Sequence, residues 1–383
     1  MPEPIQLTSK LPQTPTTIFT TMTALAEKYG AINLSQGFPD FHCSPKLIER
    51  ELYYMKKGEN QYAPMQGILP LREQIALKAE ELYGRTYHPD TEITITAGGT
   101  QAIYAAITAI TRPGDEVILF APAYDSYAPA VELCGATPVY VKMKPPDFKI
   151  DWLEVRKLLN EKTRLLIINS PHNPTGTVLT GYDMRTLQDL LQNTSAVIIS
   201  DEVYEHIIFD HRHESVMRYR ELAERSFVVF SFGKTYHVTG WKLGYCLAPA
   251  YLTKEFRKVH QYEIFSANRP LQWALADFMK EKEAYLQLAD FYKKKRDFFL
   301  QSLQGSRFRI RPADGTYFQL LDYSAITDEP DTELAVRWTK EIGIASIPVS
   351  VFYPDKSDYK LLRFCFAKAE ETLIQAGALL CRI

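Results

Sequence analysis

One lysine lies in a sequence context that suits covalent chemistry. Lys234 follows the apolar run 227–230 and is flanked by Gly233 and Thr235. A lysine partly removed from water has a lowered amine pKa and can form a Schiff base with a carbonyl compound. A lysine in a surface loop is the other interpretation. The segment also resembles the end of a nucleotide-binding P-loop, but that motif requires glycine where this sequence has Val228.

Three further polar residues follow short apolar runs. Asp201 ends the run 197–200, and a buried carboxylate there would require a partner such as a protonated ring nitrogen. That ion pair would keep a ring cationic and make it an electron sink. Asp201 would equally suit the N-cap of a helix. Tyr204 and Asn173 could donate to a ring phenolate, although Asn173-Pro174 is also typical of a turn.

A glycine pair indicates a place for an anion. Gly98-Gly99 comes before Thr100 and Gln101 at the start of an expected helix. Glycine lets the backbone approach a phosphate closely, and the free N–H groups and dipole of a helix start favour its charge. A flexible turn into the helix would use the same residues. Taken with the aromatic Tyr124 after another run, these groups indicate a flat, anionic, aldehyde-bearing cofactor.

These groups need a scaffold that brings the ends of several strands together. Continuous apolar runs are expected for strands that are covered on both faces. Helical stretches, such as 101–110 and 183–192, separate several of them, which predicts an α/β domain with a mostly parallel sheet. Ligands bind outside the carboxyl ends of such strands. The expected strands are 93–97, 117–120, 165–169, 197–200, 227–231 and 243–248.

The last third of the chain has a different pattern. A charged helical stretch over 281–303 leads to strands at 318–322 and 361–366, with helices near 331–342 and 369–381. This pattern predicts a second, smaller α+β domain. Residues 1–20 are expected to form an extended arm. The predicted division is 1–45 for this arm and part of the small domain, 46–285 for the large cofactor-binding domain, and 286–383 for the C-terminal small domain.

Composition excludes several classes of protein. The 383 residues carry 44 Lys and Arg against 46 Asp and Glu, a net charge of −2, which gives no reason to expect nucleic acid or an anionic membrane as partner. Apolar runs are too short to span a bilayer, and the N-terminus lacks signal-peptide features. The five cysteines are scattered and odd in number, typical of a reducing compartment. We expect a cytoplasmic protein.

Other chemical motifs give weaker indications. His206, His211 and His213 lie close together in the sequence, but their spacing matches no metal motif, so a polar surface loop is expected. The sequence contains neither a nucleophile elbow of the Gly-x-Ser-x-Gly type nor a dinucleotide fingerprint.

The chain resembles class I, fold-type I aminotransferases that depend on pyridoxal 5'-phosphate (PLP). It is most similar to the branch that holds methionine aminotransferases and kynurenine–oxoglutarate transaminases. The resemblance runs from about Phe19 to the C-terminus. The motifs that carry it are NLSQGFPD at 33–40, NQYAP at 60–64, PHNPTG at 171–176, SDEVY at 200–204, SFGKT at 231–235 and LRFCFAK at 362–368.

The resemblance implies a role for each site residue. Lys234, Asp201 and Tyr204 would be catalytic, with Lys234 holding PLP covalently, Asp201 facing its pyridine nitrogen, and Asn173 with Tyr204 contacting its phenolic oxygen. Tyr124 would stack on the ring. The phosphate would be surrounded by Gly99, Thr100, Gln101, Ser231 and Lys242, joined by Tyr62 of the partner subunit. Arg363 would grip the substrate α-carboxylate, helped by Asn173 and the backbone at Gly37. Such a site implies a homodimer.

One position departs from the wider class. Many class I aminotransferases have arginine eight residues after the Schiff-base lysine, where this sequence has Lys242. An ammonium can balance phosphate charge but cannot provide the planar fork of a guanidinium. The methionine and kynurenine branch shares this lysine, so the departure narrows the resemblance.

The implied reaction is a ping-pong transfer of an α-amino group to a 2-oxo acid, with Lys234 as general base and then acid. Phe19, Tyr62 and Tyr124 could line an apolar pocket, which favours methionine and aromatic amino acids as donors. A kynurenine–oxoglutarate transaminase and a cysteine-S-conjugate carbon–sulfur β-lyase remain alternatives. A transcription regulator of this fold is disfavoured, because only about 20 residues precede the resemblance, too few for a DNA-binding domain.

Overall fold

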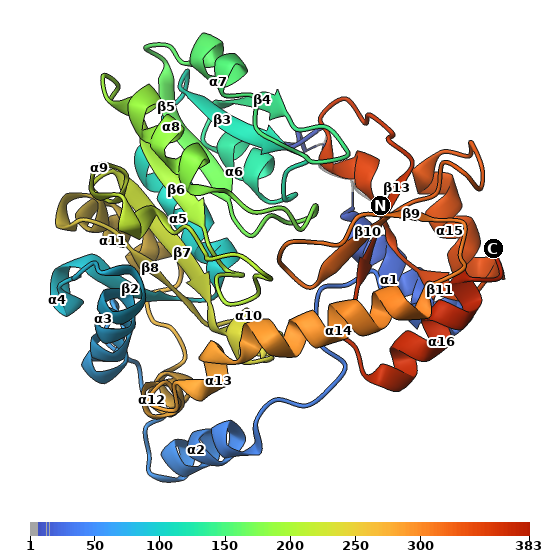
Figure 1. Cartoon of the computed structure of the whole chain (residues 1–383). Helices are drawn as coiled ribbons and strands as arrows, with labels where there is room; N and C mark the ends of the chain where they lie inside the picture. Colours follow the sequence, from blue (N-terminus) through green and yellow to red (C-terminus); the bar gives the residue numbers. More distant parts are fainter. Residues whose placement is uncertain (1–6, 13, 15) are drawn as a thin grey trace, which may run out of the picture.

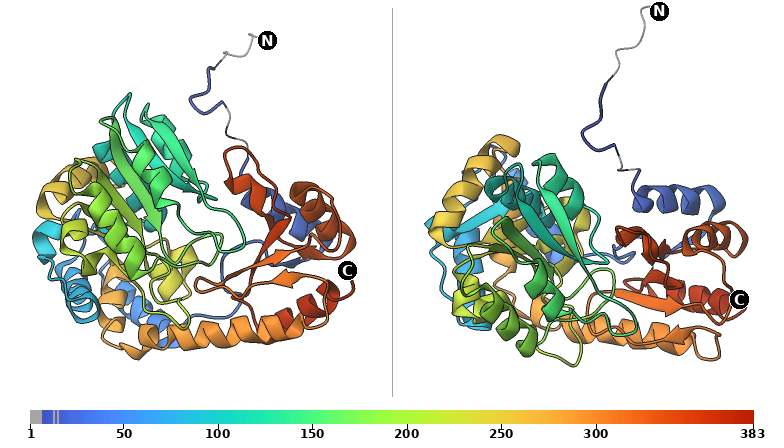
Figure 2. Two further views of the ribbon diagram at one scale, coloured as in Figure 1. Left: turned by 45° about the horizontal axis from the view of Figure 1, so that its top comes forward. Right: turned by 90° about the horizontal axis from the view of Figure 1, so that it is seen from above.

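The fold is built around two β-sheets that lie side by side (Figure 1 and Figure 2). This computed structural model describes residues 7–12, 14 and 16–383. The larger sheet has the strand order β2-β8-β7-β6-β5-β3-β4, in which β8 is antiparallel to both neighbours and all other pairs are parallel. The predicted mostly parallel sheet is therefore confirmed. Its strands are β2 (Ile93–Thr96), β3 (Glu116–Ala121), β4 (Thr137–Lys142), β5 (Thr163–Asn169), β6 (Val197–Asp201), β7 (Ser226–Ser231) and β8 (Gly244–Leu247).

Burial on both faces explains the continuous apolar runs of the central strands. Successive residues of β5 alternate between two hydrophobic clusters, with Leu165 and Ile167 on one face and Leu166 and Ile168 on the other. β4 has a different pattern and was not expected as a strand. It lies at the edge of the sheet, where its partly exposed side chains and Pro138 are tolerated.

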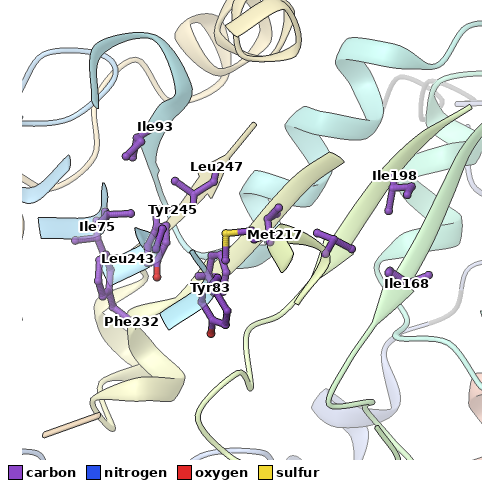
Figure 3. Packing of buried hydrophobic residues seen from close by; sticks show 14 of the residues in the cluster. Ile75, Tyr83, Ile93, Ile168, Ile198, Met217, Phe232, Leu243, Tyr245 and Leu247 are labelled. Atoms are coloured by element: carbon purple, nitrogen blue, oxygen red, sulfur yellow. The ribbon is translucent and has the colours of Figure 1, made fainter. Parts of the chain in front are cut away.

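Helices cover both faces of the large sheet. One face packs against α5 (Gly99–Ile110), α6 (Tyr127–Leu133) and α11 (Ala250–Glu263). The other packs against α3 (Leu69–Tyr83), α8 (Gly181–Leu191) and α12 (Arg269–Phe278). Figure 3 shows part of this second cluster, in which Ile75 of α3 lies beside Ile93, Tyr245 and Leu247 of the sheet.

The smaller sheet is antiparallel, with the order β12-β13-β10-β9. Its strands are β9 (Arg309–Ile310), β10 (Phe318–Asp322), β12 (Ile347–Pro348) and β13 (Leu361–Cys365), and helices α1 (Ile18–Tyr29), α14 (Leu288–Ser302), α15 (Asp331–Glu341) and α16 (Glu370–Leu380) enclose their own hydrophobic cluster. A parallel pair, β1 (Ile32–Asn33) with β11 (Ile344–Ala345), ties the N-terminal segment to this body. In Figure 1, α14 (orange) runs from the large sheet to the small one.

The remaining helices and turns complete the described chain. They are α2 (Pro45–Lys56), α4 (Pro89–Glu92), α7 (Trp152–Leu158), α9 (Arg220–Ala223), α10 (Phe232–Thr235) and α13 (Glu283–Leu286), with the 3-10 turns η1 (Val216–Arg218), η2 (Thr239–Trp241) and η3 (Val349–Phe352). The helical stretch expected over 281–303 is interrupted at Gln287, which separates α13 from α14. In the described ranges, no helix is both long and apolar enough to span a bilayer.

The division into domains stays a proposal. Two sheets, each with its own buried cluster, support a large body over 46–285 and a small one over 286–383. The N-terminal part of the small body, placed within 1–45, is supported by α1 and β1. The expected arm over 1–20 falls partly outside the described residues. The expected arm reaches too far, because its last residues, from Ile18 onward, belong to helix α1.

Candidate active site

The carboxyl ends of the central strands open onto a cavity of about 350 Å³ between the two bodies. Strands β5, β6 and β7 end there, α5 begins there, and β13 reaches it from the small sheet. The structure thus brings together most of the residues predicted from the sequence. Those that line the cavity are Phe19, Gly37, Gly99, Thr100, Tyr124, Asn173, Asp201, Tyr204, Ser231, Lys234, Lys242 and Arg363.

Lys234 faces this cavity from α10, the short helix after β7. Gly233 is required beside it, because a Cβ atom there would lie 2.9 Å from the Thr239 Cα. The Lys234 Nζ donates to the Gly37 carbonyl at 3.1 Å and to the Tyr317 hydroxyl at 2.8 Å. Burial lowers the pKa of Lys234 to about 8, against an opposing effect of Cys365. About a tenth of the amine is then neutral at pH 7, which makes it a competent nucleophile.

Asp201 ends β6 in a buried position without an ion-pair partner among the described residues. Its carboxylate accepts from the Tyr127 hydroxyl at 2.5 Å and from the Val203 N–H at 3.3 Å. Burial raises the pKa of Asp201 to about 6, although the hydrogen bond from Tyr127 opposes this change. A buried carboxylate that lacks a cation fits the protonated nitrogen of a pyridine ring.

The start of α5 fits a phosphate. Gly98 at its N-cap has φ +86°, a conformation that side chains rarely adopt, and the first N–H groups of the helix carry its positive dipole end. A Cβ at Gly98 would lie 3.7 Å from the Lys242 Nζ, so this ammonium stands beside the turn. Lys242 itself has φ 52°. Backbone donors, an ammonium and the hydroxyls of Thr100 and Ser231 form a set that suits an anion.

Two predicted residues do not present their side chains to the cavity. The Gln101 Oε1 accepts from the Ala97 N–H at 3.2 Å, and its Nε2 donates to Glu263 at 2.7 Å. Only the backbone N–H of Gln101, in the first turn of α5, remains to meet a phosphate. Tyr62 is 77% exposed in the single chain and packs edge-on against Phe265 at 5.1 Å.

Arg363 provides a buried guanidinium at the other end of the cavity. It lies in β13, 1% exposed, with its guanidinium carbon 3.9 Å from the centre of the Phe318 ring. Its Nη1 donates to the Asn173 Oδ1 at 2.6 Å and its Nη2 to the Ser35 carbonyl at 3.0 Å. Burial lowers its pKa to about 10, which leaves it charged at neutral pH. The Nε is buried without a partner in the part described, so three N–H groups are free for a carboxylate.

Three supporting residues were missed by sequence reasoning. Tyr127 lies three residues after Tyr124, a helical spacing that could have indicated a shared face. Asn169 ends β5, where its Oδ1 accepts from the Asn173 N–H and its Nδ2 donates to the Asp201 carbonyl, both at 2.8 Å. Tyr317 comes from the small body, and no local pattern links it to Lys234.

The histidine cluster is not the expected surface loop. His213 is buried, and its Nε2 lies 2.7 Å from a Glu202 oxygen, while His206 is largely buried beside Glu205. His211 is exposed, as expected. Within the described ranges, no group of three or more His, Cys, Asp or Glu side chains is arranged to hold a metal ion.

The buried carboxylate gives the first prediction. In the cofactor-free protein, the pKa of Asp201 lies near 6 folded and near 3.8 unfolded, so the folded chain binds more protons between these values. Its stability is therefore expected to fall by about 3 kcal/mol as the pH rises through this interval. Asp201→Asn removes this contribution. Urea unfolding of both proteins at about pH 4 and about pH 7 measures it, and an unchanged pH dependence in the variant would contradict the account.

Comparisons with known proteins agree with this geometry. Residues 29–378 match the family profile "Aminotransferase class I and II". The chain is 53% identical to a methionine aminotransferase of Escherichia coli over 96% of each chain, and 32% identical to human kynurenine–oxoglutarate transaminase 1 over 91% of each. A crystal structure from Escherichia coli, described as identifying a methionine aminotransferase function, superposes with a TM-score of 0.97 at 52% identity and covers 99% of this chain and 100% of its own.

The match spans both sheets and every strand end that lines the cavity. The predicted family, fold class, cofactor and reaction class are therefore confirmed. The chain belongs to the class I and II aminotransferase family and is a PLP-dependent transaminase of fold-type I architecture, acting on amino acids and 2-oxo acids.

Proposed function

We propose that this transaminase moves the α-amino group of methionine and aromatic amino acids to a 2-oxo acid. The observation that carries the proposal is the surroundings of Arg363, where a charged grip for one carboxylate lies among aromatic rings. The similarity to the methionine aminotransferase of Escherichia coli supports the same donor.

The site residues serve two functions: some hold the cofactor, and others act on the substrate. Bound PLP supplies the electron sink, which Asp201 sustains by keeping a negative charge beside the ring nitrogen. We assign Asn173 and Tyr204 to its phenolic oxygen and Tyr124 to its ring face, since all three residues line the cavity. The phosphate end takes Lys242, Ser231, Thr100, Gly99 and the backbone N–H of Gln101.

The transfer of the proton is assigned to Lys234. Its free amine would take the proton from the substrate α-carbon and later give one back, acting first as general base and then as general acid. Arg363 holds the α-carboxylate through two parallel N–H bonds, with Asn173 and the backbone at Gly37 beside it. A substrate fixed at its carboxylate presents its α-hydrogen in a constant direction, which lowers the entropic part of the barrier.

The lining of the cavity favours an uncharged donor side chain. Its cationic residues in the described chain are Lys234, Lys242 and Arg363, each already assigned. Phe19 and Phe318 provide apolar surface near Arg363, and Phe38 lines the same cavity. A second carboxylate would lose its hydration there without gaining an ion pair, so aspartate and glutamate are expected to be poor donors.

A panel of donors with one common 2-oxo acid tests this preference. We expect the highest kcat/KM for methionine, phenylalanine, tyrosine or kynurenine, and at least about tenfold less for aspartate, because a buried unpaired carboxylate is costly. Best turnover with aspartate would overturn the proposal.

A parallel assay without acceptor measures pyruvate and ammonia from a cysteine S-conjugate. Release there at a rate above transamination would assign the alternative β-lyase function.

We further propose a homodimer, in which Tyr62 of the partner subunit completes the phosphate site. Large apolar side chains are exposed on α2, on the loop after it and at the end of α11: Ile48, Leu52, Tyr53, Met55, Tyr62, Tyr262 and Phe265. Light scattering is expected to give a molar mass of twice 43.9 kDa.

Tyr62→Phe is expected to weaken PLP binding about tenfold through one lost hydrogen bond. A monomeric, fully active enzyme would contradict this assignment.

We also propose the cytoplasm as the compartment. The five cysteines are unpaired in the described structure, and Cys246 and Cys365 are buried thiols. Free thiols of this kind persist where the surroundings are reducing.

A further inference from the structure

Tyr317 joins the catalytic lysine to the small body of the protein. Its side chain is fully buried, and its hydroxyl lies 2.8 Å from the Lys234 Nζ. The same hydroxyl donates to the Gly37 carbonyl, which also accepts from Lys234 at 3.1 Å. Lys234, Tyr317 and Gly37 therefore form a closed triangle of hydrogen bonds, built from three segments that are distant in the sequence.

The surrounding packing holds the Tyr317 ring in one place. Tyr317 directly precedes β10, and its ring centre lies 5.2 Å from that of Tyr204, in an edge-on arrangement, and 5.6 Å from that of Tyr292. Gly37 approaches closely, because a Cβ there would lie 2.6 Å from the Phe318 ring and 3.2 Å from the Tyr317 ring. The hydroxyl thus has a fixed position, and so has the carbonyl that it bonds.

The hydrogen-bond directions constrain the lysine amine. Because the Tyr317 hydrogen is donated to Gly37, the phenol oxygen acts as an acceptor toward Lys234. Two acceptors then fix two hydrogens of the amine. The carbon Cε and these hydrogens occupy three of its four tetrahedral directions, so the direction of the fourth, which holds the lone pair or the transferred proton, is also fixed.

The geometry points to Tyr317 as a positioning residue that orients the released amine of Lys234 during proton transfer. This inference rests on the proposed role of Lys234 as the base. An amine that rotates freely spends little time aligned with the α-hydrogen, whereas one held by two acceptors is aligned in advance. Tyr317 lies outside the set of residues that line the cavity, and its hydroxyl meets this set at Lys234 and at the Gly37 carbonyl.

Tyr317→Phe removes the hydroxyl and keeps the ring. With methionine as donor, we expect kcat to fall about tenfold from lost alignment, with KM changed less than about twofold. A second readout uses the cofactor-free protein, in which the labelling rate of Lys234 by an amine reagent is followed against pH by peptide mass spectrometry. Losing an acceptor for the charged amine lowers its pKa, and we expect a fall of about one unit.

A matched control removes a neighbouring hydroxyl. Tyr292 is fully buried against the Tyr317 ring, and its hydroxyl has no hydrogen-bond partner among the described residues. Tyr292→Phe is therefore expected to leave both kcat and the labelling profile unchanged. The other charged or titratable groups near Lys234 include Asp201, Tyr204, Lys242, Arg363 and Cys365, and both variants retain them.

Several outcomes would overturn the inference. The first is a Tyr317→Phe protein that matches Tyr292→Phe in kcat and in the labelling profile. A Tyr317→Phe protein with raised KM and unchanged kcat would instead show a role in substrate binding. If Tyr317→Phe fails to fold, fluorotyrosine at position 317 replaces it, and its weaker acceptor must shift both readouts in the same direction. If Lys234 is not the base of the proposed function, transamination would survive Lys234→Ala. That result separates a failure of the proposed function from a failure of this inference.

Discussion

Lys234→Ala is expected to lower the rate of transamination by at least about 10⁴-fold, the size of loss seen when a residue that performs the chemistry is removed. The variant loses the nucleophile that anchors PLP and the base that moves the α-proton. No other lysine takes over, because Lys242 stands beside the N-terminal turn of α5, at the phosphate end of the cavity. The rate is measured from the amount of oxo acid product formed over time, with methionine as donor and saturating PLP.

The matched control for this substitution is Lys258→Ala. Lys258 is an exposed lysine of α11 whose ion pair with Glu255 lies on the surface, and such pairs contribute little. This control is expected to keep full activity and full PLP content. Undiminished turnover in Lys234→Ala would mean that another amine performs the reaction.

Arg363→Lys is expected to lower kcat/KM for methionine by about 10²- to 10³-fold, or about 3 to 4 kcal/mol. A lysine keeps the charge but cannot hold the Asn173 oxygen, the Ser35 carbonyl and a substrate carboxylate at once with planar geometry. It also loses the stacking on Phe318. Binding and turnover should both suffer, because the carboxylate grip fixes the direction of the α-hydrogen.

Arg337→Lys serves as its control. Arg337 forms a partly exposed ion pair with Glu329 in the small body, and neither residue lines the cavity. This change is expected to leave kcat/KM within about twofold of the original value. If Arg363→Lys behaves in the same way, the carboxylate grip must lie elsewhere in the cavity.

Much of the fold was predictable because the central strands are buried on both faces. Such strands leave continuous apolar runs in the sequence, and the residue after each run must lie at the carboxyl edge of the sheet. Asp201, Asn173 and Lys234 were found in this way. The edge strand β4 was not predicted, because its partly exposed side chains and its proline weaken the apolar pattern of a strand.

Contacts between the two bodies could not be predicted from local patterns. The hydrogen bond between Arg363 and Asn173 joins residues that are 190 positions apart, and only the family resemblance assigned both of them to the substrate carboxylate. Tyr317 has neither a local pattern nor a motif that points to Lys234. The side chain of Gln101 turns toward Glu263, the last residue of α11. The packing of α11 against α5 brings this carboxylate within hydrogen-bonding distance.

The central claim is that Lys234 carries the cofactor. Reduction of the PLP-loaded protein with borohydride fixes the bond between amine and cofactor, and peptide mass spectrometry then locates it. The account predicts one phosphopyridoxyl group per chain, on the peptide that contains Lys234. When methionine is added before the reductant, this peptide is expected to carry no such group. A label on Lys242 or on any other lysine, with Lys234 unmodified, would contradict the account.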